Sequence, residues 1–161
     1  MMDVFLKANS AEDLLMRGQF DKAAALAQEV LADCEQCAQP QLVLAYSFLK
    51  LGRADQAIAV LRAAVQRRPD VLLLRSLAQM EISTRDFEHA AETLALYASI
   101  DPTDGEVPLL RGDILAKQGR VSEAVASYAE AARLDEERVG VMAGERIEHL
   151  QAGPPTQGES P

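Results

Sequence analysis

An all-α fold of stacked helical pairs is predicted by three features of the 161-residue sequence. Ala and Leu dominate its hydrophobic 48%, whereas aromatic residues make up 4%. This balance favours helices over sheets, because Ala and Leu are strong helix formers. The same residue types return at intervals of about 34 residues, and within each interval the apolar residues are spaced to lie on one helical face.

The repeat is defined by an alanine column whose members are 34, 33 and 34 residues apart, and by a turn column five positions earlier. Glycine occupies the turn column in three of the four intervals, and glycine takes a positive φ without steric cost. The column therefore predicts a turn between two helices in every interval. The two columns are formed by Ala23, Ala57, Ala90 and Ala124 and by Gly18, Gly52, Arg85 and Gly119.

Four helix–turn–helix repeats follow from these columns, at residues 4–37, 38–71, 71–104 and 105–138. In the second repeat, the first helix presents Leu44 and Phe48 on one face, and the second helix presents Leu61. Small alanines beside them let the two helices approach closely. Pro69 and Pro102 end the second helices of repeats two and three.

This pattern resembles the tetratricopeptide repeat family. The resemblance rests on L-A-x-x-F-x-x-x-G-x-x-x-x-A-x-x-x-L-x-x-A-x-x-x-x-P from Leu44 to Pro69, with weaker copies on either side, and covers residues 4–138. Three positions depart from it: Arg85 replaces a turn glycine, Tyr97 replaces a small residue, and the first repeat lacks a proline at its end. The resemblance implies an α-solenoid, which three good repeats suffice to build.

A capping helix is predicted at residues 139–150, which complete an array spanning residues 1–150. Val139, Met142, Ile147 and Leu150 are spaced as one apolar side, with charged residues between them. Such a helix covers the last open face of a repeat array. Residues 151–161 consist mainly of Gly, Pro, Thr, Gln and Ser without apolar periodicity, so this tail is expected to be disordered.

Charge and hydropathy exclude several functional classes. A net charge of −9 repels nucleic acid. Uncharged apolar runs in the body, such as Val71 to Leu74, are far shorter than the ~20 residues that cross a bilayer. Residues 1–13 show no pattern of a secretory signal, so a cytoplasmic location is expected.

The charge is unevenly distributed, since repeat two has a net charge of +3 and repeat three a net charge of −4. Arg62, Arg67 and Arg68 of repeat two are interpreted as a solvated outer face rather than a docking patch.

Cys34 and Cys37 form a single C-x-x-C motif. A zinc site needs a second pair of ligands, and His89 and His149 lack the spacing for it. A redox pair is expected in a βαβ setting, which the surrounding residues do not predict. We therefore expect two reduced thiols near a helix end, with the redox pair as the alternative, and we expect no metal or other cofactor.

In proteins that this chain resembles, the first helices of the pairs line a concave groove. The groove positions here are unusually apolar for exposed residues, which indicates a contact site for a hydrophobic or amphipathic segment. The alternative for each leucine is packing against a neighbouring repeat. The predicted partner-binding residues are Phe5, Met16, Leu42, Tyr46, Leu49, Lys50, Leu72, Arg75, Gln79, Ile82, Leu109 and Asp113.

The sequence thus predicts a non-enzymatic scaffold or adaptor that binds a protein or peptide segment. No catalytic motif is present, and the paired lysines that other family members use to bind an acidic chaperone tail are missing. The alternative function is a cytoplasmic secretion chaperone similar to the class II chaperones of type III secretion. Self-association, through the capping helix or residues 5–16, is a third possibility.

Overall fold

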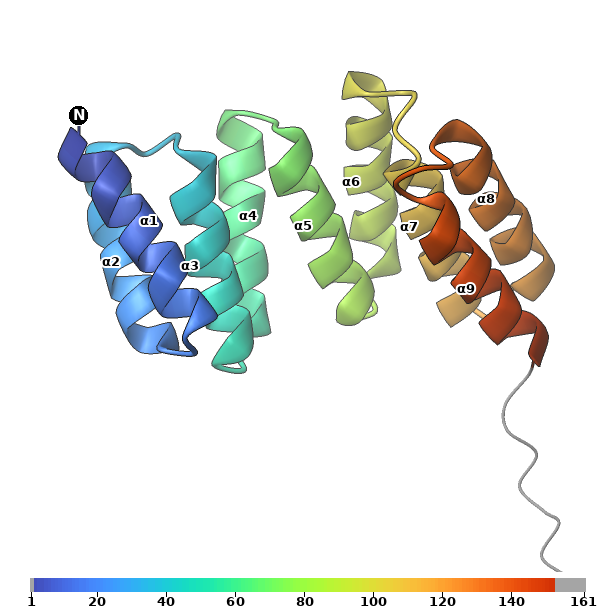
Figure 1. The fold of residues 1–161 in the computed structure, drawn as a ribbon, viewed down its shortest axis with the longest axis horizontal. Coiled ribbons are helices and arrows are strands. Elements are labelled where there is room, and N and C mark those ends of the chain that lie inside the picture. The colour runs from blue at the N-terminus through green and yellow to red at the C-terminus, as the bar shows by residue number, and fades with distance from the viewer. Residues whose placement is uncertain (1, 153–161) are drawn as a thin grey trace, which may run out of the picture. The chain divides into compact units, whose positions relative to one another are not determined.

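The computed structural model describes residues 2–152, and all regular structure in that range is helical (Figure 1). This confirms the all-α prediction. The helices are α1 (Met2–Met16), α2 (Phe20–Asp33), α3 (Ala38–Lys50), α4 (Ala54–Arg67), α5 (Val71–Ser83), α6 (Phe87–Ile100), α7 (Glu106–Lys117), α8 (Val121–Leu134) and α9 (Gly140–Ala152). One consecutive pair of helices, from α1 and α2 to α7 and α8, falls at each of the four predicted repeats, although α1 begins at Met2, before the predicted start at residue 4.

Two compact units make up the chain, unit 1 at residues 1–89 and unit 2 at residues 90–161. The boundary falls within α6, so unit 1 holds α1 to α5 and the first turn of α6. Unit 2 holds the rest of α6 and the helices α7 to α9.

The turns between paired helices have the backbone conformation that the glycine column predicts. Gly18, Gly52 and Gly119 have φ between 74° and 78°, and Arg85 has φ 64°. The hydrogen bonding repeats as well: Arg53 N donates to the Phe48 carbonyl at 2.8 Å, as Asp86 N donates to the Glu81 carbonyl at 2.9 Å. Arg85 therefore takes a left-handed turn despite the steric cost of its Cβ.

In unit 1, the first helices contact each other as well as their partners. Helix α3 contacts α1, α2, α4 and α5, and in Figure 1 α1 and α3 lie toward the viewer, with α2 behind α1. The core between α1, α2 and α3 consists of buried Ala11, Ala23, Ala24, Ala27, Val43 and Leu44, with Phe48 and five other apolar side chains packed against it. All four alanines of the repeat column are fully buried.

In unit 2, α7 packs closely on α8 because Gly112 has no side chain at the contact. A Cβ at Gly112 would collide with the Tyr128 ring. The core contains Leu109, Ala124, Tyr128 and Ala131, together with Val139, which directly precedes α9, and Ala143 in the first turn of α9. Tyr97, at the position where the family has a small residue, is also buried, and its hydroxyl donates to Asp104 Oδ2 at 2.6 Å.

Helix α9 occupies the place of the predicted capping helix and contacts α8. It extends through Gln151 and Ala152, which the sequence assigns to the tail; the rest of that tail, 153–161, lies outside the described residues. Among the helices of residues 2–152, none is long and apolar enough to cross a membrane.

Candidate functional site

Eight of the ten predicted partner-binding residues in unit 1 share one side of α1, α3 and α5. Gln39 of α3 donates to Glu12 Oε2 at 2.5 Å and to Asn9 Oδ1 at 3.4 Å. Phe5 and Met16 are at helical spacing from Asn9 and Glu12, so they share that side of α1. We call the set the first-helix face: Phe5, Met16, Leu42, Tyr46, Leu49, Leu72, Arg75 and Gln79.

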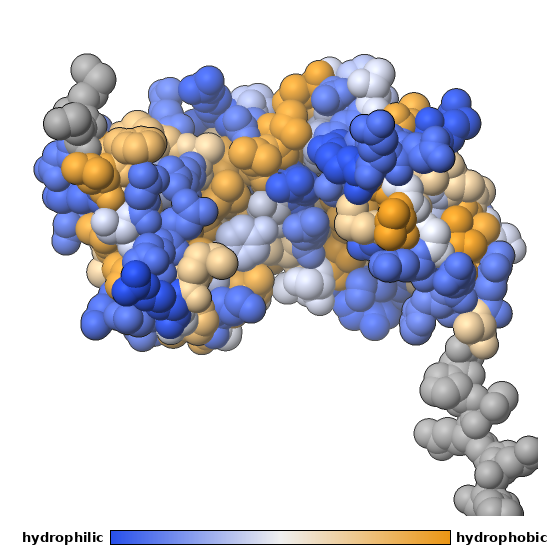
Figure 2. All heavy atoms as spheres, viewed as in Figure 1, coloured by the Kyte–Doolittle hydropathy of each residue, from blue (hydrophilic) through white to orange (hydrophobic). Residues whose placement is uncertain are grey.

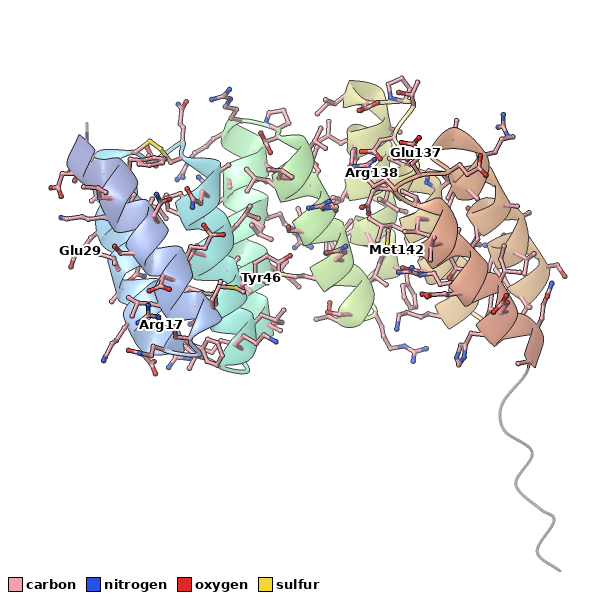
Figure 3. All side chains as sticks on the ribbon, viewed as in Figure 1. Arg17, Glu29, Tyr46, Glu137, Arg138 and Met142 are labelled. Carbon is pink, nitrogen blue, oxygen red and sulfur yellow. A yellow bond between two sulfur atoms is a disulfide. The ribbon has the colours of Figure 1, made fainter. Side chains whose placement is uncertain are left out.

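Tyr46 joins α3 to α5 at the centre of this face. Its hydroxyl donates to Ser76 Oγ at 3.2 Å, and Ser76 is buried. Figure 3 shows the Tyr46 side chain directed from α3 toward α5. Leu42 and Leu49, one turn away on either side, are partly exposed. Tyr46 thus links the two helices through its hydroxyl, while the residue remains partly exposed.

Large apolar side chains on this face are open to solvent. Met16 is 81% exposed, Phe5 64% and Leu72 48%. Polar residues are interspersed, since Gln79 is exposed and Arg75 is partly exposed. Figure 2 shows the same alternation of apolar and polar atoms over unit 1. Lys50, at the end of α3, is exposed beside the face.

Two predicted residues are buried, and the prediction is wrong for them. Ile82 is 4% exposed and Leu109 is 2% exposed. Leu109 packs in the core of unit 2 with Ala124 and Tyr128. The two residues lie at the edge of the predicted stripe on their helices, where the same spacing fits an inward or an outward side chain.

Asp113 of unit 2 is engaged within the protein. It accepts hydrogen bonds from the Tyr128 hydroxyl at 2.8 Å and from Arg146 Nε at 2.8 Å, so it links α7 to both α8 and α9. Burial and this carboxylate raise the pKa of the Tyr128 hydroxyl. The three residues border a pocket of about 390 Å³ lined by Asp113, Ala116, Lys117, Tyr128, Glu145, Arg146, His149 and Leu150. Asp113 therefore stabilises unit 2.

Unit 1 contains a network of charged side chains that was not expected from the sequence. Arg62 Nη2 of α4 lies 2.7 Å from Oε1 of Glu81, which is fully buried on α5, and 3.4 Å from Asp86 Oδ2. The interpretation of Arg62 as part of a solvated face is therefore wrong. Glu81 is flanked in the sequence by apolar Met80 and Ile82. An acidic residue between two apolar ones is the sequence signal that could have indicated a buried carboxylate with a charged partner.

Asp86 extends this network to the first turn of α6. His89 Nδ1 lies 2.8 Å from Asp86 Oδ1, and this hydrogen bond holds the pKa of Asp86 below its usual value. His89 itself is exposed, as is His149. In the part of the chain that the structure describes, no three His, Cys, Asp or Glu side chains are grouped as metal ligands would be.

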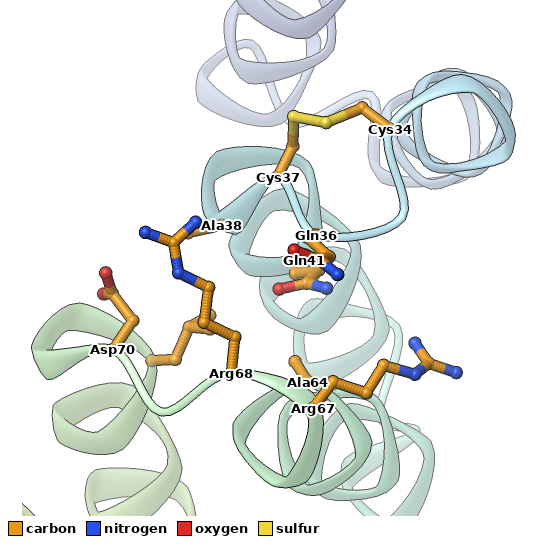
Figure 4. A pocket seen from close by; sticks show the side chains of 10 residues that line it. Cys34, Gln36, Cys37, Ala38, Gln41, Ala64, Arg67, Arg68 and Asp70 are labelled. Atoms are coloured by element: carbon orange, nitrogen blue, oxygen red, sulfur yellow. A yellow bond between two sulfur atoms is a disulfide. The ribbon is translucent and has the colours of Figure 1, made fainter.

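The cysteines form a disulfide, Cys34–Cys37, with Cα atoms 5.5 Å apart. This corrects the expectation of two reduced thiols. The bridge closes so short a loop that chain entropy alone gives about 2 kcal/mol of stabilisation. It borders a pocket of about 410 Å³ that is also lined by Gln41, Arg67, Arg68 and Asp70 (Figure 4).

The polar groups of this pocket hold the loop between the cysteines. Gln41 Nε2 donates to the Glu35 carbonyl at 2.7 Å, and Arg67 Nη2 lies 3.0 Å from Glu35 Oε1. Gln41 is buried, and its Oε1 has no hydrogen-bond partner within the protein. Arg67 and Arg68 thus face the cysteine loop rather than only solvent.

Comparison with known proteins agrees with this architecture. The sequence profile of the tetratricopeptide repeat family matches residues 9–71, 42–105 and 106–138. No curated protein sequence matches the chain.

Solved structures share the fold at low sequence identity. MamA 41-end from Desulfovibrio magneticus RS-1 is 16% identical with a TM-score of 0.72, over 92% of this chain and 84% of that one. TTC0263, a thermophilic TPR protein in Thermus thermophilus, is 18% identical with a TM-score of 0.74, over 88% and 78%. The APC/C hetero-tetramer Cut9-Hcn1 is 15% identical with a TM-score of 0.76, over 92% of this chain and 30% of that one.

Proposed function

Because this chain belongs to the tetratricopeptide repeat family, we propose that it is a non-enzymatic scaffold or adaptor that binds a segment of a partner protein on its first-helix face. The observation that carries the proposal is the exposure of Phe5, Met16 and Leu72 on this one face of unit 1. Large apolar side chains gathered on one surface are typical of contact sites.

The chemistry of the face favours an amphipathic segment. Covering one large apolar side chain contributes up to about 2 kcal/mol to binding. The apolar residues alternate with polar Arg75 and Gln79, and Lys50 lies beside them. A helix laid across α1, α3 and α5 would place its apolar side on Leu42 and Leu72 and its polar side toward these residues.

Unit 1 supports this role better than unit 2. In unit 1, the predicted residues on α3 and α5 other than Ile82 retain accessible surface. In unit 2, Leu109 is buried in the core and Asp113 is bound to Tyr128 and Arg146. We therefore assign the partner-binding function to unit 1.

Affinity capture from the native cell with mass spectrometry tests the proposal. Wild type is compared with Leu42→Glu and Tyr46→Ala, and with Ala59→Glu as a matched control, since Ala59 is an exposed alanine on α4. A partner that is lost with both face variants but kept by Ala59→Glu supports the proposal. If every captured partner is kept by correctly folded face variants, the first-helix face does not bind it.

The nature of the captured partner decides between adaptor and secretion chaperone. A membrane-inserting secreted protein held through its apolar segment would favour the chaperone. Light scattering of the purified protein addresses self-association, for which Phe5 on α1 and Val141 on α9 offer exposed apolar side chains. A monomer at all concentrations would exclude self-association.

A further inference from the structure

The Cys34–Cys37 disulfide is not part of the first-helix face, so the proposed partner binding does not explain it. Cys34 caps the end of α2 and Cys37 caps the start of α3, so the bridge lies in the short connection between two helices. Both cysteines are partly exposed and line the pocket of about 410 Å³ (Figure 4). A thiol can therefore reach the bridge while the helices remain folded.

The two sulfur atoms lie in opposite electrostatic settings. Cys37 stands at the N-terminus of the 13-residue helix α3, where the helix dipole stabilises negative charge. Cys34 stands at the C-terminus of the 14-residue helix α2, where the dipole disfavours it. The helix termini therefore favour the thiolate form of Cys37 over that of Cys34, which makes Cys37 the better leaving group.

Charged side chains of both signs lie around the bridge. Arg67 and Arg68 line the pocket together with the cysteines, and cationic neighbours favour a thiolate. Two acids accompany them, because Glu35 pairs with Arg67 and Asp70 also lines the pocket. The Asp70 carboxylate accepts a hydrogen bond from Leu72 N at the start of α5.

The loop between the cysteines is held by bonds that do not involve sulfur. Cys37 N donates to the Cys34 carbonyl at 3.1 Å, and Gln41 Nε2 donates to the Glu35 carbonyl at 2.7 Å. Arg67 holds the Glu35 carboxylate from α4. These bonds keep the two cysteines close after reduction, so the disulfide can form again without a search by the chain.

We propose that Cys34 and Cys37 form a thiol–disulfide exchange centre that is reduced by a dithiol. A thiolate of the dithiol attacks Cys34 Sγ, the Cys34–Cys37 bond breaks, and Cys37 leaves as a thiolate. The second thiolate of the dithiol then attacks the dithiol sulfur that is bonded to Cys34 Sγ. The mixed disulfide breaks, and Cys34 leaves as a thiolate. The protein gains two electrons and two protons, and the dithiol becomes a cyclic or intramolecular disulfide; an oxidised dithiol reverses both steps.

The size of the loop agrees with a redox role. Closing so short a loop stabilises the fold through chain entropy, but less than closing a loop of about 15 residues does. The proposal does not depend on partner binding, and none of its tests uses the first-helix face.

Reduction of the native protein is the first test. The oxidised chain is incubated with dithiothreitol, free thiols are counted by maleimide labelling, and helicity is followed by circular dichroism. We expect two thiols to become free with helicity unchanged, and oxidised dithiothreitol to restore the bridge. Reduction that proceeds only after denaturant is added would show a structural bridge and overturn the proposal.

Mapping of the mixed disulfide tests the direction of attack. Oxidised wild-type protein is treated with glutathione as a monothiol probe, quenched in acid and digested, and the modified cysteine is identified by mass spectrometry. We expect the adduct on Cys34. An adduct mainly on Cys37 contradicts the assignment of Cys37 as the leaving group.

Alkylation rates of single-cysteine variants test the same asymmetry. At pH 7, Cys37 in Cys34→Ser is expected to react with iodoacetamide several-fold faster than Cys34 in Cys37→Ser. Arg68→Ala should slow the reaction of Cys37, whereas Arg133→Ala, which changes an exposed arginine of unit 2, should not. Equal rates for the two cysteines, in variants with native helicity, overturn the proposal.

Discussion

In unit 1, Tyr46 and Gln79 occupy the repeat position that Asp113 occupies in unit 2, since the three residues are 33 and 34 positions apart. Gln79 is exposed and Tyr46 is partly exposed. The Asp113 side chain is 18% exposed and is paired with Arg146. This repeat position therefore lies at the surface in unit 1, where Tyr46 also donates to Ser76, and is engaged in an ion pair in unit 2.

The two units also differ in which helices an internal ion pair joins. In unit 1, Glu81 of α5 pairs with Arg62 of α4, a second helix of its repeat. In unit 2, Asp113 of α7 pairs with Arg146 of α9. The pairing in unit 1 leaves Tyr46 and Gln79 at the surface, whereas the pairing in unit 2 engages the equivalent Asp113 within the protein.

The largest loss of stability is expected from Arg62→Ala. It leaves the fully buried Glu81 carboxylate without its arginine, and removing one partner of a buried pair costs about 3 kcal/mol. Arg67→Ala is the matched control on α4, because its pair with Glu35 is exposed on both sides and is worth less than about 1 kcal/mol. Urea denaturation measures both; equal losses would show that the buried pair does not stabilise unit 1.

Asp113→Ala tests the comparison directly. We expect a loss of about 2 kcal/mol, because the Tyr128 hydroxyl and the Arg146 guanidinium both lose their acceptor. Gln79→Ala, at the equivalent position of unit 1, should change the free energy of unfolding by less than about 0.5 kcal/mol. If both variants cost the same in urea denaturation, the distinction between the units does not hold.

A smaller, pH-dependent effect is expected from Asp104 in unit 2. Burial opposes its ionisation, but the Tyr97 hydroxyl, the Glu106 amide and Arg138 outweigh burial and hold the pKa of Asp104 below its usual value. The stability it contributes is present above the unfolded pKa of about 3.9 and is lost as pH falls from there through the folded pKa.

Thermal unfolding between pH 6 and pH 2.5 measures this contribution. Asp104→Asn should remove part of the acid-induced loss of stability, whereas the exposed Asp33→Asn on α2 should retain it. An unchanged acid profile in Asp104→Asn would mean that the native contacts of Asp104 do not favour its charged form.

The smallest effects are expected at two turns of unit 1. Gly52 has φ 75°, and a Cβ there would meet nothing within 4 Å, so Gly52→Ala should cost about 1 kcal/mol through backbone strain alone.

Arg85→Gly relieves the same strain but removes the contact of Arg85 with the Phe87 ring, 5.8 Å from its centroid. The net change in Arg85→Gly should stay within about 0.5 kcal/mol; a loss above about 1 kcal/mol would show that the arginine stabilises the turn.

The repeat architecture could be predicted because local sequence determines it. The alanine column is buried wherever it occurs, and the turn column takes a positive φ even where Arg85 replaces glycine. Both features depend on residues a few positions apart, so spacing alone reveals them.

The details of the candidate site depend on contacts between distant residues. Ile82 and Leu109 lie at the edge of a helical stripe, and only the packing of neighbouring helices decides that they are buried. Arg62 and Glu81 are 19 residues apart, and no periodicity relates them. The bridge between Cys34 and Cys37 depends on the geometry of the connection between α2 and α3, which the motif does not determine.

Calorimetric titration with the segment of the captured partner tests the central claim, that unit 1 binds a partner through its first-helix face. Leu42→Glu is expected to weaken binding at least about 10-fold, because the complex would bury an unpaired charge. Ala59→Glu on α4 should bind within about twofold of wild type, since it adds the same charge away from the face. Equal affinities for wild type and a folded Leu42→Glu variant would contradict the claim.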